Sequence, residues 1–396
     1  MTTKNNIPAG YKDSAVGIIP QEWEVKRLGA CFSIGHGRDY KHLSNGDIPV
    51  YGSGGIICYV GSFLHDGETV CIGRKGTINK PFYYNGPIWT VDTLFYTHSF
   101  QSVLPRYVGY LFDSIDWMRY NEATGVPSLT AKTISNIKKA VPPLEEQRKI
   151  AEILGVWDEA IEKHSRLIEK LELRKRALMQ RLLTGRTRLP GFTTPWQKVK
   201  LGEIGKISSA GVDKKVNEGE VPVRLLNFVD VFYRNFIYND ELTHWVTAKP
   251  IKVEQCSVQK GDIFFTPSSE MPTDIAISAV AMEDMKGVVY SYHIVRLRPH
   301  IEMDLHYRAY AFQTDEFYKQ AERICDGSGQ RYVISQDGFR NMSIHLPSLP
   351  EQKAIAEVLT AADNEIATHR KKLDALRLQK RGLMQQLLTG KTRVKI

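Results

Sequence analysis

The sequence predicts an α+β protein in which two domains of mixed strands and helices are separated by two long, repeated helices. Three observations predict this architecture: one segment recurs 205 residues later, both copies carry a helical heptad pattern, and the regions between them are rich in Val, Ile, Tyr and Phe. Because each helix presents a single apolar seam that needs a partner, we expect the two helices to form an antiparallel coiled coil with internal pseudo-two-fold symmetry.

The internal repeat is clearest at the two ends of each helix. Glu-Gln at residues 146–147 returns at 351–352, and Leu-Leu-Thr-Gly at 182–185 returns at 387–390. Both pairs are 205 residues apart, so no gap is needed between them. Self-similarity at a fixed distance indicates a tandem duplication.

The apolar residues of both copies recur in alternating steps of four and three, as in the seam of a coiled coil. The candidate seam residues are Ile150, Leu154, Ile161, His164, Leu171 and Leu178 in the first copy, and Ile355, Leu359, Ile366, His369, Leu376 and Leu383 in the second. Prolines precede both helix starts and glycines follow both ends, as helix punctuation predicts. We interpret His164 and His369 as polar residues that fix the register, rather than as ligands or acid–base groups.

The repeat divides the chain into four segments. We expect a first globular domain at residues 1–125 with an N-terminal arm at 1–19, a first helical spacer at 126–194, a second globular domain at 195–340 and a second helical spacer at 341–396. Trp23 matches Trp196 and Tyr107 matches Tyr307 in the same order along the chain. The two globular domains are therefore diverged copies of one another.

The formal net charge of +9 lies almost entirely in the helical segments. Residues 126–195 contribute +6 and residues 341–396 contribute +5, whereas 20–125 contribute −1 and 196–340 contribute −2. A positive excess permits a polyanionic partner such as double-stranded DNA. The globular domains themselves are nearly neutral.

Several classes of protein are disfavoured by composition. The five cysteines include no CxxC pair, so we expect neither a disulfide framework nor a metal site. No run of about 18 apolar residues is present, and we expect no membrane span and a cytoplasmic location.

Loops in the two globular domains are candidates for DNA contact. The first domain offers a basic, glycine-flanked loop with Arg74, Lys75, Thr77, Asn79 and Lys80. The second domain offers Ser268 and Ser269 in the corresponding stretch, and a glycine-rich stretch with Gln330, Arg331 and Tyr332. Arg and Lys pair with guanine edges and Asn with adenine, whereas the simpler interpretation is an exposed turn with ordinary surface charges.

Several motifs resemble those of the specificity subunits of type I restriction-modification systems. They are the helix starts Leu-Glu-Glu-Gln (144–147) and Leu-Pro-Glu-Gln (349–352), the helix ends Leu-Met-Gln-x-Leu-Leu-Thr-Gly (178–185 and 383–390), and Trp23 and Trp196 near the domain starts. The resemblance covers nearly the whole chain.

This resemblance implies a non-catalytic DNA-recognition subunit with no catalytic residue of its own. Two target-recognition domains would each read one half of a split DNA site, and the paired helices would fix the spacer and dock partner subunits. The implied partners are two methyltransferase subunits and two restriction subunits. S-adenosylmethionine, ATP and magnesium are expected on those partners, and no cofactor is expected on this chain.

Two alternatives are open at this point. A DNA adenine methyltransferase acting alone would account for Asn79-Lys80-Pro81-Phe82, which nearly matches an Asn-Pro-Pro-Phe motif, but no βαβ setting surrounds it. A coiled-coil scaffold without DNA binding would account for the helices, but it would leave the divergence of the globular domains without a role.

Overall fold

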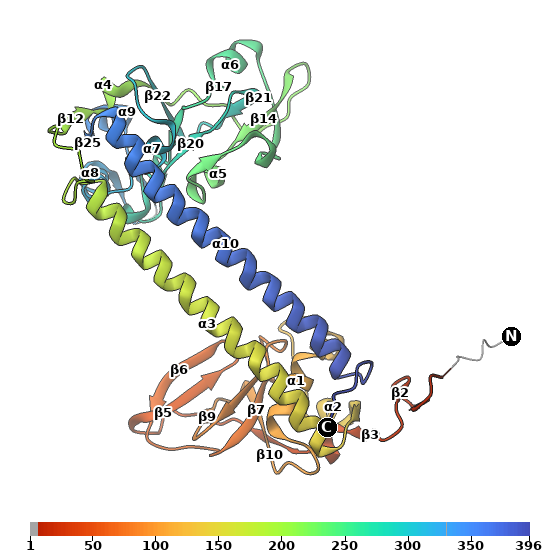
Figure 1. Ribbon diagram of the computed structural model, residues 1–396. Coiled ribbons are helices and arrows are strands. Elements are labelled where there is room, and N and C mark those ends of the chain that lie inside the picture. Colours follow the sequence, from red (N-terminus) through yellow and green to blue (C-terminus); the bar gives the residue numbers. More distant parts are fainter. Residues whose placement is uncertain (1–6, 330) are drawn as a thin grey trace. The chain divides into compact units, whose positions relative to one another are not determined.

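A computed structural model of the chain describes residues 7–329 and 331–396 (Figure 1). It divides into two compact units, which we call unit 1 (Met1–Ser165 with Lys371–Ile396) and unit 2 (Arg166–Arg370). Each unit contains one domain of mixed strands and helices, together with part of two long helices, α3 (Leu144–Leu182) and α10 (Leu349–Leu387). The predicted α+β class with two mixed domains is confirmed.

The ends of the long helices have clear physical causes. Near the start of α3, the Gln147 side chain accepts a hydrogen bond from the Leu104 amide (2.8 Å) and donates one to the Pro142 carbonyl (2.8 Å). Gly185 and Gly390 follow the two helix ends with φ of +68° and +71°. Glycine reaches this left-handed conformation without the strain that a Cβ atom imposes, so the chain turns there.

The domain of unit 1 is built on two sheets. Its antiparallel sheet contains, in order, β4 (Ser33–His36), β10 (Leu94–His98), β7 (Glu68–Gly73) and β8 (Phe82–Asn85). Its second sheet contains β6 (Gly55–Val60), β5 (Asn45–Gly52) and β9 (Trp89–Thr90). The remaining elements are β1 (Tyr11–Lys12), β2 (Ile19–Pro20), β3 (Glu24–Arg27), η1 (Leu28–Ala30), α1 (Pro105–Asp113), η2 (Trp117–Tyr120), α2 (Ala131–Asn136) and β11 (Lys138–Val141). Helix α1 packs on β7, and its buried Val108 joins Val70 in the core of the unit.

The domain of unit 2 is larger, and its described residues form three sheets of three or more strands besides one two-stranded sheet. The first contains β13 (Gly205–Ser208), β22 (Val295–Pro299), β18 (Ile263–Phe265), β20 (Ser278–Ala281) and β15 (Phe236–Ile237). The second contains β16 (Trp245–Ala248), β14 (Val221–Leu226), β21 (Met285–Tyr290) and β17 (Ser257–Val258), and the third contains β19 (Ser268–Ser269), β24 (Arg331–Val333) and β23 (Asp326–Ser328). The remaining elements are β12 (Gln197–Lys200), α4 (Leu201–Ile204), α5 (Phe228–Phe232), η3 (Asn239–Glu241), α6 (Pro250–Gln255), η4 (Pro272–Asp274), α7 (Leu305–Tyr310), α8 (Asp315–Ile324), α9 (Gln336–Asn341) and β25 (Ser343–Leu346).

The boundaries between domains and helices lie later in the chain than the residue pattern predicts. The segment 126–143, expected to open the first helical spacer, instead contains α2 and β11. Strand β11 pairs with β3 and so belongs to the domain of unit 1. In unit 2, β25 pairs with β12 in the same way. Both long helices therefore start only after a closing strand has returned the chain to the beginning of its domain.

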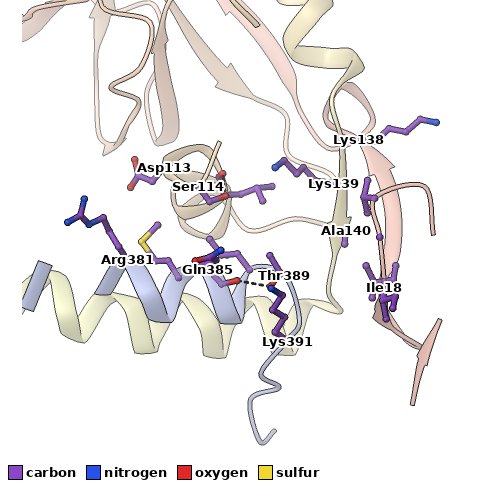
Figure 2. Close-up of a pocket in the computed structure, with 16 residues that line it drawn as sticks. Ile18, Asp113, Ser114, Lys138, Lys139, Ala140, Arg381, Gln385, Thr389 and Lys391 are labelled. Carbon is purple, nitrogen blue, oxygen red and sulfur yellow. Dashed lines mark hydrogen bonds between the residues drawn. The ribbon is translucent and has the colours of Figure 1, made fainter. Parts of the chain in front are cut away.

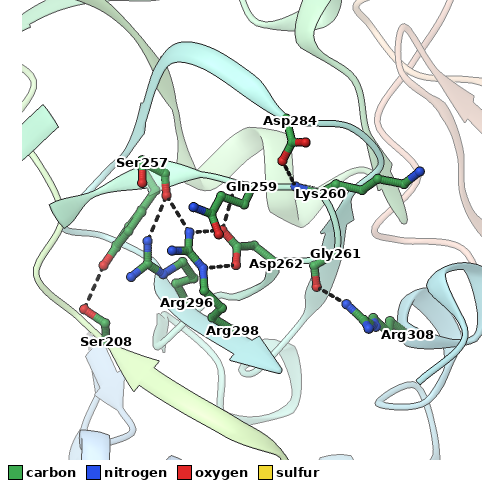
Figure 3. Close-up of polar contacts among 11 residues, drawn as sticks. Ser208, Ser257, Gln259, Lys260, Gly261, Asp262, Asp284, Arg296, Arg298 and Arg308 are labelled. Carbon is green, nitrogen blue, oxygen red and sulfur yellow. Dashed lines mark hydrogen bonds and ion pairs between the residues drawn. The ribbon is translucent and has the colours of Figure 1, made fainter. Parts of the chain in front are cut away.

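A buried ionic network fixes the strand that leads to the candidate loop of unit 2 (Figure 3). Asp262 is 1% exposed and accepts two hydrogen bonds from Arg298, at 2.7 and 2.6 Å. Arg296 and Arg298 also donate to the Ser257 carbonyl, at 2.8 and 3.0 Å. A buried carboxylate is tolerated only when it is paired in this way. The network thereby ties β17 and β22 to the start of β18, which leads into Ser268.

One surface differs between the units because α8 is present only in unit 2. Unit 1 has a groove of about 750 Å³ between the end of α1, β11 and the last turns of α10 (Figure 2). Gln385 and Lys138 line this groove. Their counterparts in the repeat, 205 residues away, are Gln180 and Ser343. In unit 2, the first amide of α8 donates to Gln180 Oε1 (3.3 Å) and Gln320 donates to the Ser343 carbonyl (2.9 Å). Helix α8 therefore covers in unit 2 the surface that is open in unit 1.

Within residues 7–329 and 331–396, no helix is both long enough and apolar enough to cross a bilayer.

Candidate nucleic-acid interface

Each domain is attached to the long helices by a buried carboxylate. In unit 1 this carboxylate is Glu146, which is 0% exposed at the start of α3. It accepts a hydrogen bond from Trp23 Nε1 (2.8 Å) and two from the Arg393 guanidinium (2.8 and 3.0 Å). The bidentate guanidinium compensates the charge that burial would otherwise penalise. We call this group the Trp–Glu–Arg clamp.

Unit 2 contains the same clamp. Glu351 is also 0% exposed, at the start of α10. It accepts two hydrogen bonds from Arg188 (2.6 and 2.8 Å) and one from Trp196 Nε1 (3.0 Å). The arginine of each clamp follows the end of one long helix, and the carboxylate lies at the start of the other. Each clamp therefore joins both helices to the beginning of a domain.

A second group attaches the last turn of a domain helix to the long helices. In unit 1, Lys380 Nζ lies 2.5 Å from Asp158 Oδ1, and the Tyr110 hydroxyl donates to Asp158 Oδ2 (2.6 Å). Burial and the hydrogen bond to Asp158 raise the pKa of Tyr110, so its hydroxyl stays protonated and remains a donor. We call this group the Tyr–Asp–Lys clamp.

Unit 2 repeats this group as well. Lys175 Nζ lies 2.5 Å from Asp363 Oδ1, and the Tyr310 hydroxyl donates to Asp363 Oδ2 (2.8 Å). Burial raises the pKa of Tyr310 in the same direction. In both units the lysine side chain is 14% exposed. The structure thus pairs Lys175 of α3 and Lys380 of α10 with carboxylates of the facing helix.

None of the twelve candidate seam residues is exposed. Six are buried, namely Ile150, Leu154, Leu171, Ile355, Leu359 and Ile366. Six are half-buried, namely Ile161, His164, Leu178, His369, Leu376 and Leu383. Within unit 2, Glu172 pairs with Arg370 and Lys175 with Asp363, so the two helices run in opposite directions there. The continuous coiled coil stays a prediction.

The candidate loop of unit 1 is held firmly at its base and free at its tip. The Arg74 amide donates to the Thr93 carbonyl (2.8 Å), and Lys75 forms a bridge with Ser128. Ile78 is 0% exposed and anchors the middle of the loop in the core. The base is therefore fixed from two directions, by the segment before β10 and by the segment before α2.

The polar side chains of this loop mostly face solvent. Arg74, Lys75, Asn79 and Lys80 are exposed and Thr77 is half-buried. Among the residues that the structure describes, none of the three cations forms an ion pair. Exposed, uncommitted cations on a fixed loop are suited to contact phosphates or base edges.

Arg38 belongs to the same surface, and the residue pattern did not identify it. This exposed residue follows β4, and its amide donates to the Thr90 carbonyl (2.8 Å). Because β10 lies between β4 and β7, Arg38 and Arg74 flank the start of β10 from opposite sides. A basic residue after a glycine, in Gly37-Arg38, was the sequence signal.

In unit 2, two candidate stretches far apart in the chain come together in one sheet. Strand β19 pairs with β24, so Ser268 lies opposite Val333 and Ser269 opposite Tyr332. Arg331 Nη2 lies 3.4 Å from Ser268 Oγ. Gln330, the other candidate of this stretch, lies outside the described residues.

A cavity of about 560 Å³ adjoins this sheet. Its apolar side comes from α5 and the residue after it, including Phe232 and Tyr233, and Tyr233 is 78% exposed. Its polar side includes Ser268, Arg331 and Glu270, an exposed residue that was not among the sequence candidates. The candidate surface of unit 2 is therefore partly acidic and partly aromatic, unlike that of unit 1.

The chain is similar to known proteins in sequence and in fold. The sequence model of the Type I restriction modification DNA specificity domain matches it twice, at residues 20–173 and 193–378. The chain belongs to the family of type I restriction-modification specificity subunits. It is similar to the specificity subunit of the type I restriction enzyme MjaVIII from Methanocaldococcus jannaschii, with 30% identity over 291 residues, which are 69% of this chain and 66% of that protein.

Two solved structures share the fold of this specificity subunit. One is the S subunit of a type I restriction-modification system from M. genitalium, with a TM-score of 0.56 at 14% identity over 98% of this chain and 99% of that one. The other comes from a study of complex assembly and conformational transition in the type I system, with a TM-score of 0.60 at 17% identity over 94% of this chain and 99% of that one.

Type I specificity subunits are non-catalytic DNA-recognition proteins. The exposed loops, rather than a catalytic cleft, are therefore the functional surface to examine in this specificity subunit. Neither a methyltransferase acting alone nor a scaffold without DNA binding gains support from these relatives. Among the described residues, no group of three or more His, Cys, Asp or Glu side chains could hold a metal ion.

Proposed function

We propose that each globular domain reads one half of a bipartite DNA site, and that the paired long helices set the spacer between the halves. The duplication of both clamps carries this proposal. The same Trp–Glu–Arg and Tyr–Asp–Lys groups attach both domains to the helices, while the exposed loops differ in charge and chemistry. Two domains that recognise two different DNA sequences need the same attachment to the helices but different contact surfaces.

The helices are suited to act as the spacer. Each contains 39 residues, which corresponds to roughly 58 Å at 1.5 Å per residue. Helices joined along a continuous seam, as a coiled coil with pseudo-two-fold symmetry, would resist bending better than a loop. They would favour half-sites separated by about one helical turn of DNA, ~34 Å.

The proposed assembly contains double-stranded DNA, two methyltransferase subunits that dock on the helices, and two restriction subunits. In this assembly the partners hold S-adenosylmethionine, ATP and magnesium. The near-neutral domains fit such an arrangement, because partner subunits would supply much of the contact to the phosphate backbone. The proposed assembly would act on its DNA substrate in the cytoplasm.

Methylation mapping tests this proposal. DNA from cells that carry the chain with its methyltransferase subunit should be methylated at a bipartite motif with an unspecified spacer. One added heptad in both helices, between residues 167 and 173 and in the facing part of α10, lengthens them by about 10 Å and should lengthen the spacer by about two to three base pairs. Both half-sites should stay unchanged. A continuous motif, or half-sites that change with the insertion, would contradict the proposal.

A further inference from the structure

The cavity of unit 2 contains a carboxylate that the clamps and the core do not use. Glu270 follows β19 directly, is exposed, and forms neither a hydrogen bond nor an ion pair with any residue that the structure describes. Its neighbour Ser269 is half-buried and held by pairing with Tyr332. The backbone under Glu270 is therefore fixed while its side chain is free to accept hydrogen bonds.

A free carboxylate on a DNA-reading surface is informative because it cannot bind a phosphate group of the DNA backbone. Like charges repel, and an ionised carboxylate has no hydrogen to donate. In the major groove the base-edge donors are the amino groups of cytosine N4 and adenine N6. In the major groove, Glu270 can therefore contact a base edge favourably only through one of these two amino groups.

Arg331 supplies the opposite chemistry in the same cavity. It is exposed and forms no ion pair with any described residue, and its Nη2 lies 3.4 Å from Ser268 Oγ. A guanidinium donates two parallel hydrogen bonds to guanine O6 and N7. Because β19 pairs with β24, Ser268 and Arg331 are neighbours and Glu270 lies two residues beyond Ser268. Two carboxylates, those of Glu270 and Asp274, and one guanidinium thus line one cavity.

We propose that this cavity, between α5 and the β19–β24 pair, is a base-reading pocket for a G·C pair. Glu270 accepts a hydrogen bond from the amino group of cytosine, and Arg331 donates to the guanine of that pair. An A·T pair would satisfy Glu270 through adenine, but it offers thymine O4 in place of the two guanine acceptors. The inference rests on the proposed function, since it assumes that unit 2 reads one half-site.

The apolar side of the cavity supports this assignment. Val229 and Met271 are 54% and 53% exposed, although apolar side chains of this size are usually covered. They offer a surface for the C5 edge of the pyrimidine. Phe228 and Phe232 stack at 5.6 Å beneath this surface, and Asn227 caps α5, so the wall is preformed. Excluding water beside Glu270 and Arg331 strengthens their hydrogen bonds.

The test is methylation mapping of the complex with its methyltransferase subunit, using E270A, E270Q, R331A and the matched control E218Q. Glu218 is exposed and lies outside the cavity. In the wild type, one half-site should contain a G·C pair whose replacement lowers methylation. E270A and R331A should each reduce discrimination at this one pair by roughly 5- to 150-fold. E270Q should shift preference there from cytosine towards adenine, because an amide pairs with adenine N6 and N7.

Other outcomes distinguish a failure of the base-reading pocket from a failure of the proposed function. A wild-type motif that is bipartite but unchanged in E270A and R331A would overturn the pocket and leave the proposed function standing. A uniform loss of methylation at every sequence, with an unchanged melting temperature, would make these residues backbone contacts and would also overturn it. The absence of any bipartite motif in the wild type would overturn both. E218Q should match the wild type in every case.

Discussion

The two units mount their domains in the same way and expose different chemistry. Both bury a glutamate between a tryptophan and an arginine, and both pair a tyrosine and a lysine through an aspartate. Their candidate DNA-contact surfaces differ. Unit 1 exposes Arg38, Arg74 and Lys75, whereas unit 2 exposes Glu270 beside Arg331. The duplication therefore retained the buried electrostatics, which any change would unbalance, and diverged in exposed loops, which stability constrains weakly.

The largest effect should come from the buried glutamates. E146A and E351A each remove the buried acceptor shared by an arginine and an indole N–H, so each should destabilise its own unit by about 3–5 kcal/mol. Because the two clamps are equivalent, the two losses should be similar. Denaturant unfolding, followed by hydrogen exchange to assign the loss to a unit, would measure them.

Glu22 provides the control for this comparison. It also binds Arg393, at 2.9 Å, but its side chain is 60% exposed. E22A should therefore destabilise unit 1 much less than E146A does. Losses that differ by more than about 2 kcal/mol between E146A and E351A would show that the clamps are not energetically equivalent.

The tyrosines of the second clamp should give the next largest effect. Y110F and Y310F remove a hydroxyl that donates to a carboxylate already paired with lysine. Hydrogen bonds to charged groups contribute about 1.5–3 kcal/mol, so each variant should lose stability in that range. The same unfolding measurement applies. A loss of stability in only one of the two variants would show that the two Tyr–Asp–Lys clamps are not equivalent.

Much of the helical architecture could be predicted from the residues, because it depends on local pattern. The heptad steps and the terminal glycines are readable in a single segment, and none of the twelve seam residues is exposed. The boundary at residue 126 was placed too early for α3, because the pairing of β11 with β3 joins segments more than 100 residues apart. Helix α8 was also not anticipated, because the corresponding stretch of unit 1 forms only the short helix η2.

The candidate site was only partly predictable for the same reason. The sequence identified Ser268 and Arg331 as separate candidates, but not that β19 and β24 pair and bring them together. It did not identify Glu270, because an exposed glutamate in a turn is ordinary until a cavity and an arginine are found beside it. Arg38 was missed similarly, because the sheet order that places it near Arg74 depends on a long-range pairing.

A smaller effect, confined to one half-site, should come from the loop of unit 1. R74A, K75A and N79A should each relax one half-site by about 1–3 kcal/mol if the residue reads a base. The other half-site should keep its full discrimination. Competition binding against single-base variants of the mapped site would measure this, at more than one salt concentration. Equal weakening for all sequences, with a smaller salt dependence, would instead make the residue a phosphate contact.

The smallest effect should come from the exposed ion pair between the long helices. Arg370 Nη2 lies 2.5 Å from Glu172 Oε1, but the two side chains are 63% and 37% exposed. Exposed pairs are screened by water and salt and contribute about 0–1 kcal/mol, so R370A should leave the stability of unit 2 nearly unchanged. Unfolding of R370A beside E351A, at low and high salt, compares an exposed with a buried pair in the same unit. If R370A lost as much as E351A, surface charge rather than the buried clamps would hold the helices together.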